Sequence, residues 1–576
     1  MRELAFLDYA VMTVYLSAIF LAGIWFTKKA SNSVEDFFLG GRSMPWWLIG
    51  VSMAATNFSI DTPVAVTRFL YKEGIGGVWF LWASAISAIF VTLFFARLWN
   101  RAQVVTDAEL IELRYSGKAA AALRVLKGVY FGILFNVFIM GWVFLSLRKV
   151  LQGVTSLDIL TALWVTVILV FIYSVAAGFY GVVLTDFIQY FMALTGSILL
   201  AYLSVQAVGG IDSLIAALPS AASAPKGALD FFPGFSKDSS LPLELFLVYV
   251  MVQWWAHKYA DGGGKHIQRM LSAKDENHSI LGSALYTFLT YCFQVWPWII
   301  TGLCSMVLLT DLKDPEMAYP LMMAKILPVG LLGFVLVCLI GAFMSTIDTH
   351  LNLGASYVVN DLYRRFFAPH KSPEHYVLIS RLVMAALLAG SVILSLNLES
   401  VGKTWKFLLT FASGAGLTWI LRWFWWRVNA ISEITAMILS GVTATTLEMA
   451  VPELAYGTKL IITVCISTVG WLTATFLTKA DEEDTLREFV LRVRPPGFGW
   501  KGIYATIPGS TPTNLGRGLI HWVLGMGVFF GLNFSIGSFL LKTPMQGMTL
   551  LALSGICSLV LAISMSQEMK VQKNSA

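Results

Sequence analysis

Apolar runs of about 20 residues recur along this chain, and about 20 residues is the length with which an α-helix crosses the hydrocarbon core of a bilayer. Charged residues gather in the short segments between these runs. By this measure we count about 15 candidate membrane spans. They lie near 6–26, 45–68, 75–100, 127–150, 157–177, 180–208, 242–260, 277–309, 328–364, 375–397, 401–426, 430–452, 457–478, 517–541 and 546–566. The pattern predicts an all-α polytopic membrane protein.

Composition agrees with that interpretation. Of the 576 residues, 57% are hydrophobic and 13% are charged, whereas soluble domains average about 45–50% apolar and about 25% charged residues. The net charge of +6 comes with basic residues that lie mainly in short loops, where they set the orientation of the chain in the membrane. We therefore expect no nucleic-acid partner. All five cysteines fall inside apolar runs and lack the spacing of disulfide or zinc sites. The first run is longer than a signal-peptide core of about 7–15 residues, so we expect it to be a retained span.

Basic residues occupy alternate loops, which predicts how the chain lies in a cell membrane. Loops rich in Lys and Arg face the cytoplasm. The basic loop residues are Lys28, Lys29, Arg42, Arg97, Arg101, Arg114, Lys118, Arg124, Lys258, Lys265, Arg269, Lys274, Arg364, Arg365, Arg422, Arg427, Lys479, Arg487, Arg492, Arg494 and Lys501. We therefore expect the N-terminus outside and the C-terminus in the cytoplasm, which an odd number of spans also requires.

The second span, near 45–68, is a poor continuous helix. Small and polar residues at 54–59 interrupt it and Asp61, Thr62 and Pro63 follow. Proline removes a backbone donor and disfavours helix at the preceding residue. Broken helices in pairs, with ions held by the freed carbonyls, are typical of secondary transporters built from inverted repeats. The seventh span, near 242–260, is short and ends in Asp261 and three glycines, so we expect it to be the counterpart.

This pairing suggests how the chain is organised. Residues 45–208 would form a first five-helix repeat and residues 242–426 a second one. Residues 1–44 would form a peripheral first span with its cytoplasmic loop, and residues 427–576 a set of peripheral C-terminal spans. We expect no soluble output domain.

The ninth span carries polar residues at a depth where they are costly. The segment 341–349 places a carboxylate and three hydroxyls inside an apolar stretch near 327–359, and an ionised residue at a helix centre costs about 2.5–3.5 kcal/mol on insertion scales. At helical spacing Ala342, Ser345, Thr346 and Thr349 share one face, with Asp348 beside it. Hard oxygen ligands at this depth suit a small cation such as Na⁺. The segment indicates ion transport.

Four stretches together resemble the sodium:solute symporter family, over roughly residues 1–480. They are Asp36-Phe37-Phe38-Leu39-Gly40-Gly41-Arg42, the segment 181–189 containing Thr185 and Asp186, the loop 268–274 reading Gln-Arg-Met-Leu-Ser-Ala-Lys, and the segment 342–363. The resemblance implies a LeuT-type five-plus-five inverted repeat. It also implies a sodium-coupled symporter that imports a small organic solute by alternating access, with Na⁺ as coupling ion, no organic cofactor and no enzymatic activity.

The family's main sodium site implies five ligands here. Matched position by position, they are the backbone carbonyls of Ala55, Phe58 and Ala342 and the hydroxyls of Ser345 and Thr346. The residues agree with this assignment, because the broken span frees carbonyls and the i, i+3, i+4 spacing directs three ninth-span positions to one point.

A second sodium site, present in some members, would fall on Asp186, Ser345, Asp348 and Thr349. An Asp at 348 replaces the serine expected from the family. The two carboxylates could bind a second Na⁺, or they could share a proton, since neighbouring carboxylates do not easily both ionise. Asp186 could instead cap the start of its helix.

The solute contacts of known relatives do not carry over. The acid, amide and Lys of the sugar transporters and the Arg of the sialic-acid transporters have no counterpart at the matching positions. The remaining candidates line an expected aromatic cavity. They are Asp61, Thr62, Trp79, Trp82, Gln253, Trp254, Trp255 and Tyr259. His350 is expected to line the cytoplasmic vestibule, and the glycine run before Lys265 lacks the ending of a phosphate-binding loop.

Three other readings remain beside the sodium symporter. Proton coupling through Asp186 and Asp348 would keep the same fold. A solute-sensing membrane module would require an output domain, and a membrane-embedded enzyme would require a nucleophile–base pair or a metal site. The expected partners are the lipid bilayer and a sugar, amino acid or organic acid.

Overall fold

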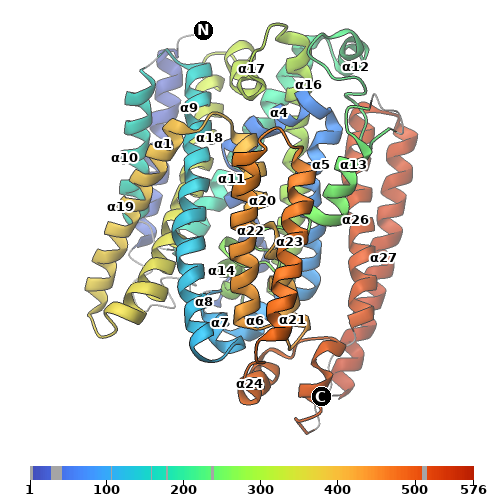
Figure 1. The fold of residues 1–576 in the computed structure, drawn as a ribbon. Coiled ribbons are helices and arrows are strands. Elements are labelled where there is room, and N and C mark those ends of the chain that lie inside the picture. Colours follow the sequence, from blue (N-terminus) through green and yellow to red (C-terminus); the bar gives the residue numbers. More distant parts are fainter. Residues whose placement is uncertain are drawn as a thin grey trace.

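The computed structural model describes residues 4–27, 42–104, 107–156, 158–176, 179–234, 239–508 and 515–575. These residues form one bundle of long helices (Figure 1). Within the described ranges the only β-pairing is an isolated bridge between Met44 and Ala273. The prediction of an all-α membrane protein is confirmed.

Each apolar range expected from the sequence corresponds to a helix, a broken helix or a run of consecutive helices. The first half of the chain holds α1 (Phe6–Thr27), α3 (Trp46–Asn57), α4 (Asp61–Glu73), η2 (Ile75–Val78), α5 (Trp79–Phe90), η3 (Val91–Phe95), α6 (Ala96–Ala102), α7 (Glu109–Arg114), α8 (Gly117–Val129), η4 (Tyr130–Phe135), α9 (Asn136–Val154), α10 (Ile159–Ala176), α11 (Phe179–Val208), α12 (Ile211–Ala217), η5 (Leu218–Ser220), α13 (Leu243–Val248), η6 (Tyr249–Gln253), α14 (Lys265–Ser272) and α15 (Glu276–Phe288). The second half holds η7 (Leu289–Phe293), α16 (Val295–Leu308), η8 (Pro315–Met317), α17 (Ala318–Ile326), α18 (Leu331–Ser356), η9 (Tyr357–Phe367), α19 (Pro373–Asn397), α20 (Val401–Ser413), α21 (Gly416–Phe424), α22 (Ala430–Ala450), α23 (Tyr456–Leu477), α24 (Glu483–Val493), η10 (Phe498–Trp500), α25 (Lys501–Tyr504), α26 (Leu515–Leu541) and α27 (Pro544–Ser575).

Among the described residues, ten helices are long and apolar enough to cross a membrane, and the bent pair α20 and α21 raises this to eleven. The remaining expected spans are shorter or broken helices, such as α3 with α4 and α13 with η6. The start of α1 and the end of α27 lie at opposite ends of the bundle (Figure 1). An odd number of membrane crossings requires this arrangement. Which end faces the cytoplasm stays a prediction from loop charge.

The first break separates α3 from α4. Helix α3 ends at Asn57 and α4 begins at Asp61. The Phe58 amide donates to the carbonyls of Ala54 and Ala55, at 2.8 and 3.1 Å, which closes the last turn. Pro63 lies in the first turn of α4, where a missing N–H costs little because that turn has no partners for its donors. The interruption expected from the sequence is confirmed.

The second break is longer and starts earlier than the sequence suggested. Helical structure ends at Gln253 and resumes at Lys265, so the irregular segment begins before the aspartate and glycines that marked it. Tyr259, Gly262 and Gly264 have positive φ angles of 62°, 82° and 66°, which no helix accommodates. The segment also lies against α21, because a β-carbon added at Gly416 would stand 2.1 Å from the Trp255 carbonyl oxygen.

Burial separates the central helices from those that face lipid. In the apolar window of the span Leu331–Phe367, 89% of residues are buried, against 6% for the window in Pro544–Gln567. Helix α18 therefore forms the centre, and α3 and α11 pack on it and on each other. Helices α26 and α27 pack together at one edge of the bundle (Figure 1).

Candidate functional site

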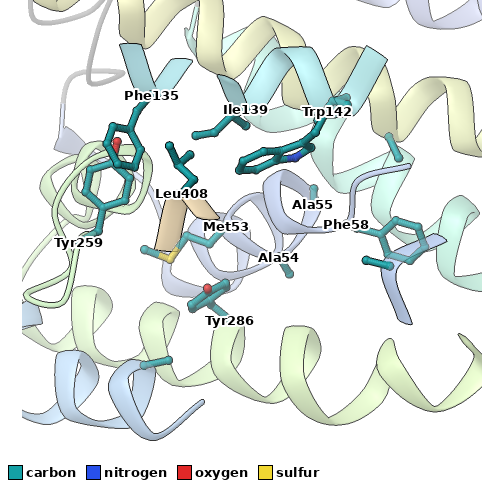
Figure 2. Close-up of a cluster of buried hydrophobic side chains, with 14 of the residues drawn as sticks. Met53, Ala54, Ala55, Phe58, Phe135, Ile139, Trp142, Tyr259, Tyr286 and Leu408 are labelled. Carbon is teal, nitrogen blue, oxygen red and sulfur yellow. The ribbon is translucent and has the colours of Figure 1, made fainter. Parts of the chain in front are cut away.

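A cavity of about 280 Å³ lies where the two breaks meet. Its walls come from α3, α4, α5 with η3, the irregular segment after Gln253 with α14, and from η4, α9, α15, η7, α16, α18 and α20. Figure 2 shows part of the wall, with Phe135, Ile139 and Trp142 on one helix above Met53 of α3. Pockets for small molecules usually enclose about 300–1,000 Å³, so the space suits one small solute.

The residues of the expected main sodium site come from two helices that pack directly on each other, α3 and α18. Ala55 and Phe58 lie at the open end of α3. On α18 the Thr346 hydroxyl donates to the Ala342 carbonyl at 3.0 Å, and Thr346 also lines the cavity. The Ser345 hydroxyl donates to Asp186 at 2.6 Å.

The ring of Phe58 fixes the end of α3. It packs on Trp298 and Tyr190, with ring centroids 5.0 and 6.1 Å apart, and is 1% exposed. Because this side chain is held by α16 and α11, the backbone at the end of α3 has little room to move.

The residues of the expected second site gather around a residue that the sequence analysis had placed in a loop. One Asp186 oxygen accepts from Ser52 at 2.6 Å and from the Arg269 guanidinium at 3.4 Å, and Asp186 and Arg269 are both buried. The same guanidinium lies 3.4 Å from the Thr349 hydroxyl. Asp348 accepts from the Asn352 amide at 2.9 Å. The positively charged side chain of Arg269 therefore lies among the residues that were predicted to bind a second sodium ion.

Three of the eight expected solute contacts, Asp61, Thr62 and Tyr259, line the cavity. The other five lie outside the cavity lining and have structural partners. Trp79 donates to the Phe231 carbonyl, Trp82 packs on Trp296 and Phe534, Gln253 bonds Phe80 and Tyr456, Trp254 packs on Trp522, and Trp255 donates to the Met251 carbonyl. Their rings and amides hold the segment around Phe231, α26 and α23 against the bundle.

The sequence analysis missed several cavity residues. Lys258 and Lys265, counted there as loop cations, line the cavity together with His257 and His266. His350, expected in the cytoplasmic vestibule, lines it too and bonds the Asn136 side chain at 2.6 Å. One feature of the sequence could have indicated that the two lysines line the cavity: both lie beside a glycine run at the end of a short span. The motif residues 36–41 lie outside the described residues.

Comparison with known proteins agrees with this arrangement. The model of the sodium:solute symporter family matches residues 37–440. The chain belongs to this family. It is 24% identical to a sodium/glucose cotransporter of Vibrio parahaemolyticus, over 76% of this chain and 84% of the relative. It is 25% identical to the osmoregulated proline transporter OpuE of Bacillus subtilis, over 75% and 86%.

The fold of this symporter agrees with a solved relative. A Na⁺-coupled sialic acid symporter in a substrate-bound outward-open state aligns with a TM-score of 0.69 at 20% identity, over 83% of this chain and 99% of that one. The family and its members establish sodium-coupled symport of a small solute as the function, and the LeuT-type architecture expected from the sequence is confirmed.

Proposed function

We propose that this symporter works by alternating access, with Na⁺ bound between the end of α3 and the middle of α18, next to the central cavity. One observation carries the proposal: the end of α3, which bears Ala55 and Phe58, lies on a helix that packs directly on α18, and Thr346 of α18 lines the cavity beside them. In transporters built from inverted repeats, one helix bundle rocks against the other around such a midplane site. The ligands would be the carbonyls of Ala55, Phe58 and Ala342 and the hydroxyls of Ser345 and Thr346.

We further propose one sodium ion per cycle. A second ion at Asp186 would have to displace or share space with the Arg269 guanidinium, which already lies against that carboxylate and against Thr349. Two like charges in a low-dielectric interior repel strongly. Each inward charge gains about 2.3 kcal/mol per 100 mV of membrane potential. Proton coupling through Asp186 and Asp348 is the alternative, and it would also have to act in the field of Arg269.

The relatives suggest the size and polarity of the solute. Their names include glucose, mannose, proline and myo-inositol, which are all small polar molecules. We therefore propose import of one small polar organic solute across the cell membrane, with the N-terminus outside as loop charge predicts. Catalysis forms no part of the proposal.

Reconstitution tests this function. Purified protein in proteoliposomes would be assayed with radiolabelled sugars, amino acids and organic acids under an inward Na⁺ gradient. Control vesicles would carry an equal choline gradient, or a proton gradient without Na⁺. We expect uptake above equilibrium only with Na⁺. Equal accumulation driven by protons alone would favour the alternative, and accumulation without any ion gradient would contradict symport.

A further inference from the structure

The central cavity has two lysines in its wall. Lys258 lies in the middle of the second break, and Lys265 is the first residue of α14, directly after the break. The Lys258 ammonium lies 5.1 Å from the ring centroid of Phe135, 5.8 Å from that of Trp142 and 5.4 Å from that of Tyr259. The Lys265 ammonium lies 3.4 Å from the Thr56 carbonyl. Within the described residues neither ammonium forms an ion pair with a carboxylate.

The other charged groups in the cavity wall do not neutralise the two lysines. Asp61 is the only carboxylate among the described lining residues, and it lies within electrostatic reach of both lysines. Two lysines and one aspartate give +2 − 1 = +1 with neutral histidines. A sodium ion bound next to Thr346 would add to this excess.

The histidines of the wall have partners of their own. His257 contacts the Ser87 hydroxyl at 3.1 Å and His266 contacts the Asn57 amide at 3.3 Å. His350 contacts Asn136. These neutral partners hold the rings in place and leave the charge excess unchanged.

Several other polar atoms of the wall lack a hydrogen-bond partner among the described residues. On the buried residues these atoms are Oγ of Ser59, Oδ1 of Asp61, the Tyr259 hydroxyl, Oγ1 of Thr290 and Oε1 of Gln294. Each of these side chains belongs to a residue that is at most 8% exposed and that lines the cavity. Buried polar groups are normally hydrogen-bonded, so such a set marks a place where a polar ligand completes the bonding.

We propose that the transported solute is a small organic anion whose carboxylate is held between Lys258 and Lys265. This inference rests on the proposed symport function and names the solute class of the same cavity. A buried positive excess is costly unless it is paired, and a monocarboxylate neutralises the excess of the wall. A neutral sugar leaves that excess unpaired, and so does a zwitterion, which brings no net charge. Asp61 then accepts a hydrogen bond from a hydroxyl or amide elsewhere on the solute.

The test compares probes of similar size that differ in whether one end carries a carboxylate or a neutral group. The purified protein is heated with the matched pairs gluconate and sorbitol, lactate and lactamide, and benzoate and benzamide, with proline as a zwitterion. Each probe is measured once in NaCl and once in choline chloride. We expect the carboxylate of at least one pair to raise the unfolding temperature in Na⁺ only, while its neutral partner at the same concentration does not. If none of these carboxylates gives a sodium-dependent shift, the inference is wrong.

Lysine variants test where the carboxylate lies. Lys258→Met and Lys265→Met should each weaken binding of the effective carboxylate by about tenfold or more, whereas Lys258→Arg and Lys265→Arg, which keep the charge, should lose less. Lys542→Met is the matched control, because Lys542 is partly exposed and lies outside the cavity lining. Its affinity should stay within about twofold of the parent. Unaltered affinity in both cavity Met variants would overturn the proposal.

Transport of the same probes separates this inference from the function. Sodium-driven uptake of a neutral or zwitterionic probe, with no uptake of any carboxylate, would overturn the anion assignment and leave symport intact. Carboxylate uptake that needs no Na⁺ would instead contradict the proposed coupling. Stabilisation of each Met variant by Na⁺ alone shows that the variant is folded.

Discussion

Arg269 donates to Asp186 across 3.4 Å in an ion pair that joins α14 to α11 and is 1% exposed on both sides. The pair lies next to Ser345, which binds the second oxygen of Asp186. Helix α14 starts at Lys265, only four residues before Arg269, so the pair connects the end of the second break to the centre of the bundle. A fixed positive charge thus stands where the sequence alone had suggested a second transported cation.

Breaking this pair should destabilise the protein strongly. Asp186→Asn or Arg269→Gln leaves the other charge buried without its partner, which typically costs about 3–5 kcal/mol. The double variant should lose less than the sum of the two single variants, because it removes both charges. Unfolding by denaturant at fixed Na⁺ measures the coupling. Strictly additive losses would show that the two groups do not interact.

The same pair makes a prediction about ion coupling. With Arg269 in place, sodium dependence of uptake should follow a hyperbola, and one sodium ion should enter per solute molecule. Arg269→Gln leaves a carboxylate without its fixed cation and should create a second, weaker sodium dependence. Parallel fluxes of labelled sodium and labelled solute give the ratio. A ratio of two in the parent protein would restore the second site predicted from Asp186 and Asp348.

The close contact between α21 and the second break should be sensitive to one methyl group. Gly416→Ala would place a β-carbon against the Trp255 carbonyl, and backbone cannot yield as a flexible side chain does. We expect impaired solute binding with a loss of stability of about 1–3 kcal/mol, the usual cost of overpacking. Gly555→Ala is the control, because nothing lies within 4 Å of its added carbon. Equal stability and equal solute binding in the two variants would contradict the observed packing.

A second buried charge cluster holds the Asp261 end of this break. Glu433 lies 2.9 Å from Lys127, and Arg422 binds both Glu433 and Asp261. Glu433→Gln leaves Lys127 without its carboxylate and should cost about 3–5 kcal/mol. We expect Lys127→Met combined with Glu433→Gln to recover part of that loss. Thermal unfolding in detergent gives the comparison, and no recovery would mean that Lys127 and Glu433 are not energetically coupled.

The sequence predicted the helices and the first break well, because lipid imposes span length and Pro63 and its small neighbours interrupt a helix locally. It placed the second break too late. The residues from Trp254 to Tyr259 have no unusual local preference, and the irregular path is stabilised by tertiary contacts with Gly416 and Arg422.

Solute contacts were harder to predict than helices. A tryptophan in a span can face lipid, core or cavity. Trp79 and Trp82 pack against Phe534 of α26, and Trp79 also bonds the Phe231 carbonyl. Lys258 and Lys265 were assigned to a cytoplasmic loop because they continue the series of basic residues in alternate loops. Only the path of the broken helix reveals that their side chains face the cavity.

The most direct test of the account is sodium binding to purified protein, measured with radiolabelled Na⁺ in the absence of any solute. Ser345→Ala combined with Thr346→Ala removes two of the five proposed ligand oxygens and should weaken binding by at least about tenfold, or about 1.4 kcal/mol. The control combines Ser391→Ala with Thr410→Ala, two hydroxyls buried elsewhere that bond only helix carbonyls, at 2.7 and 2.9 Å. The control should bind Na⁺ like the parent. Parent-like sodium affinity in the Ser345 and Thr346 double variant, at normal stability, would contradict the proposed site.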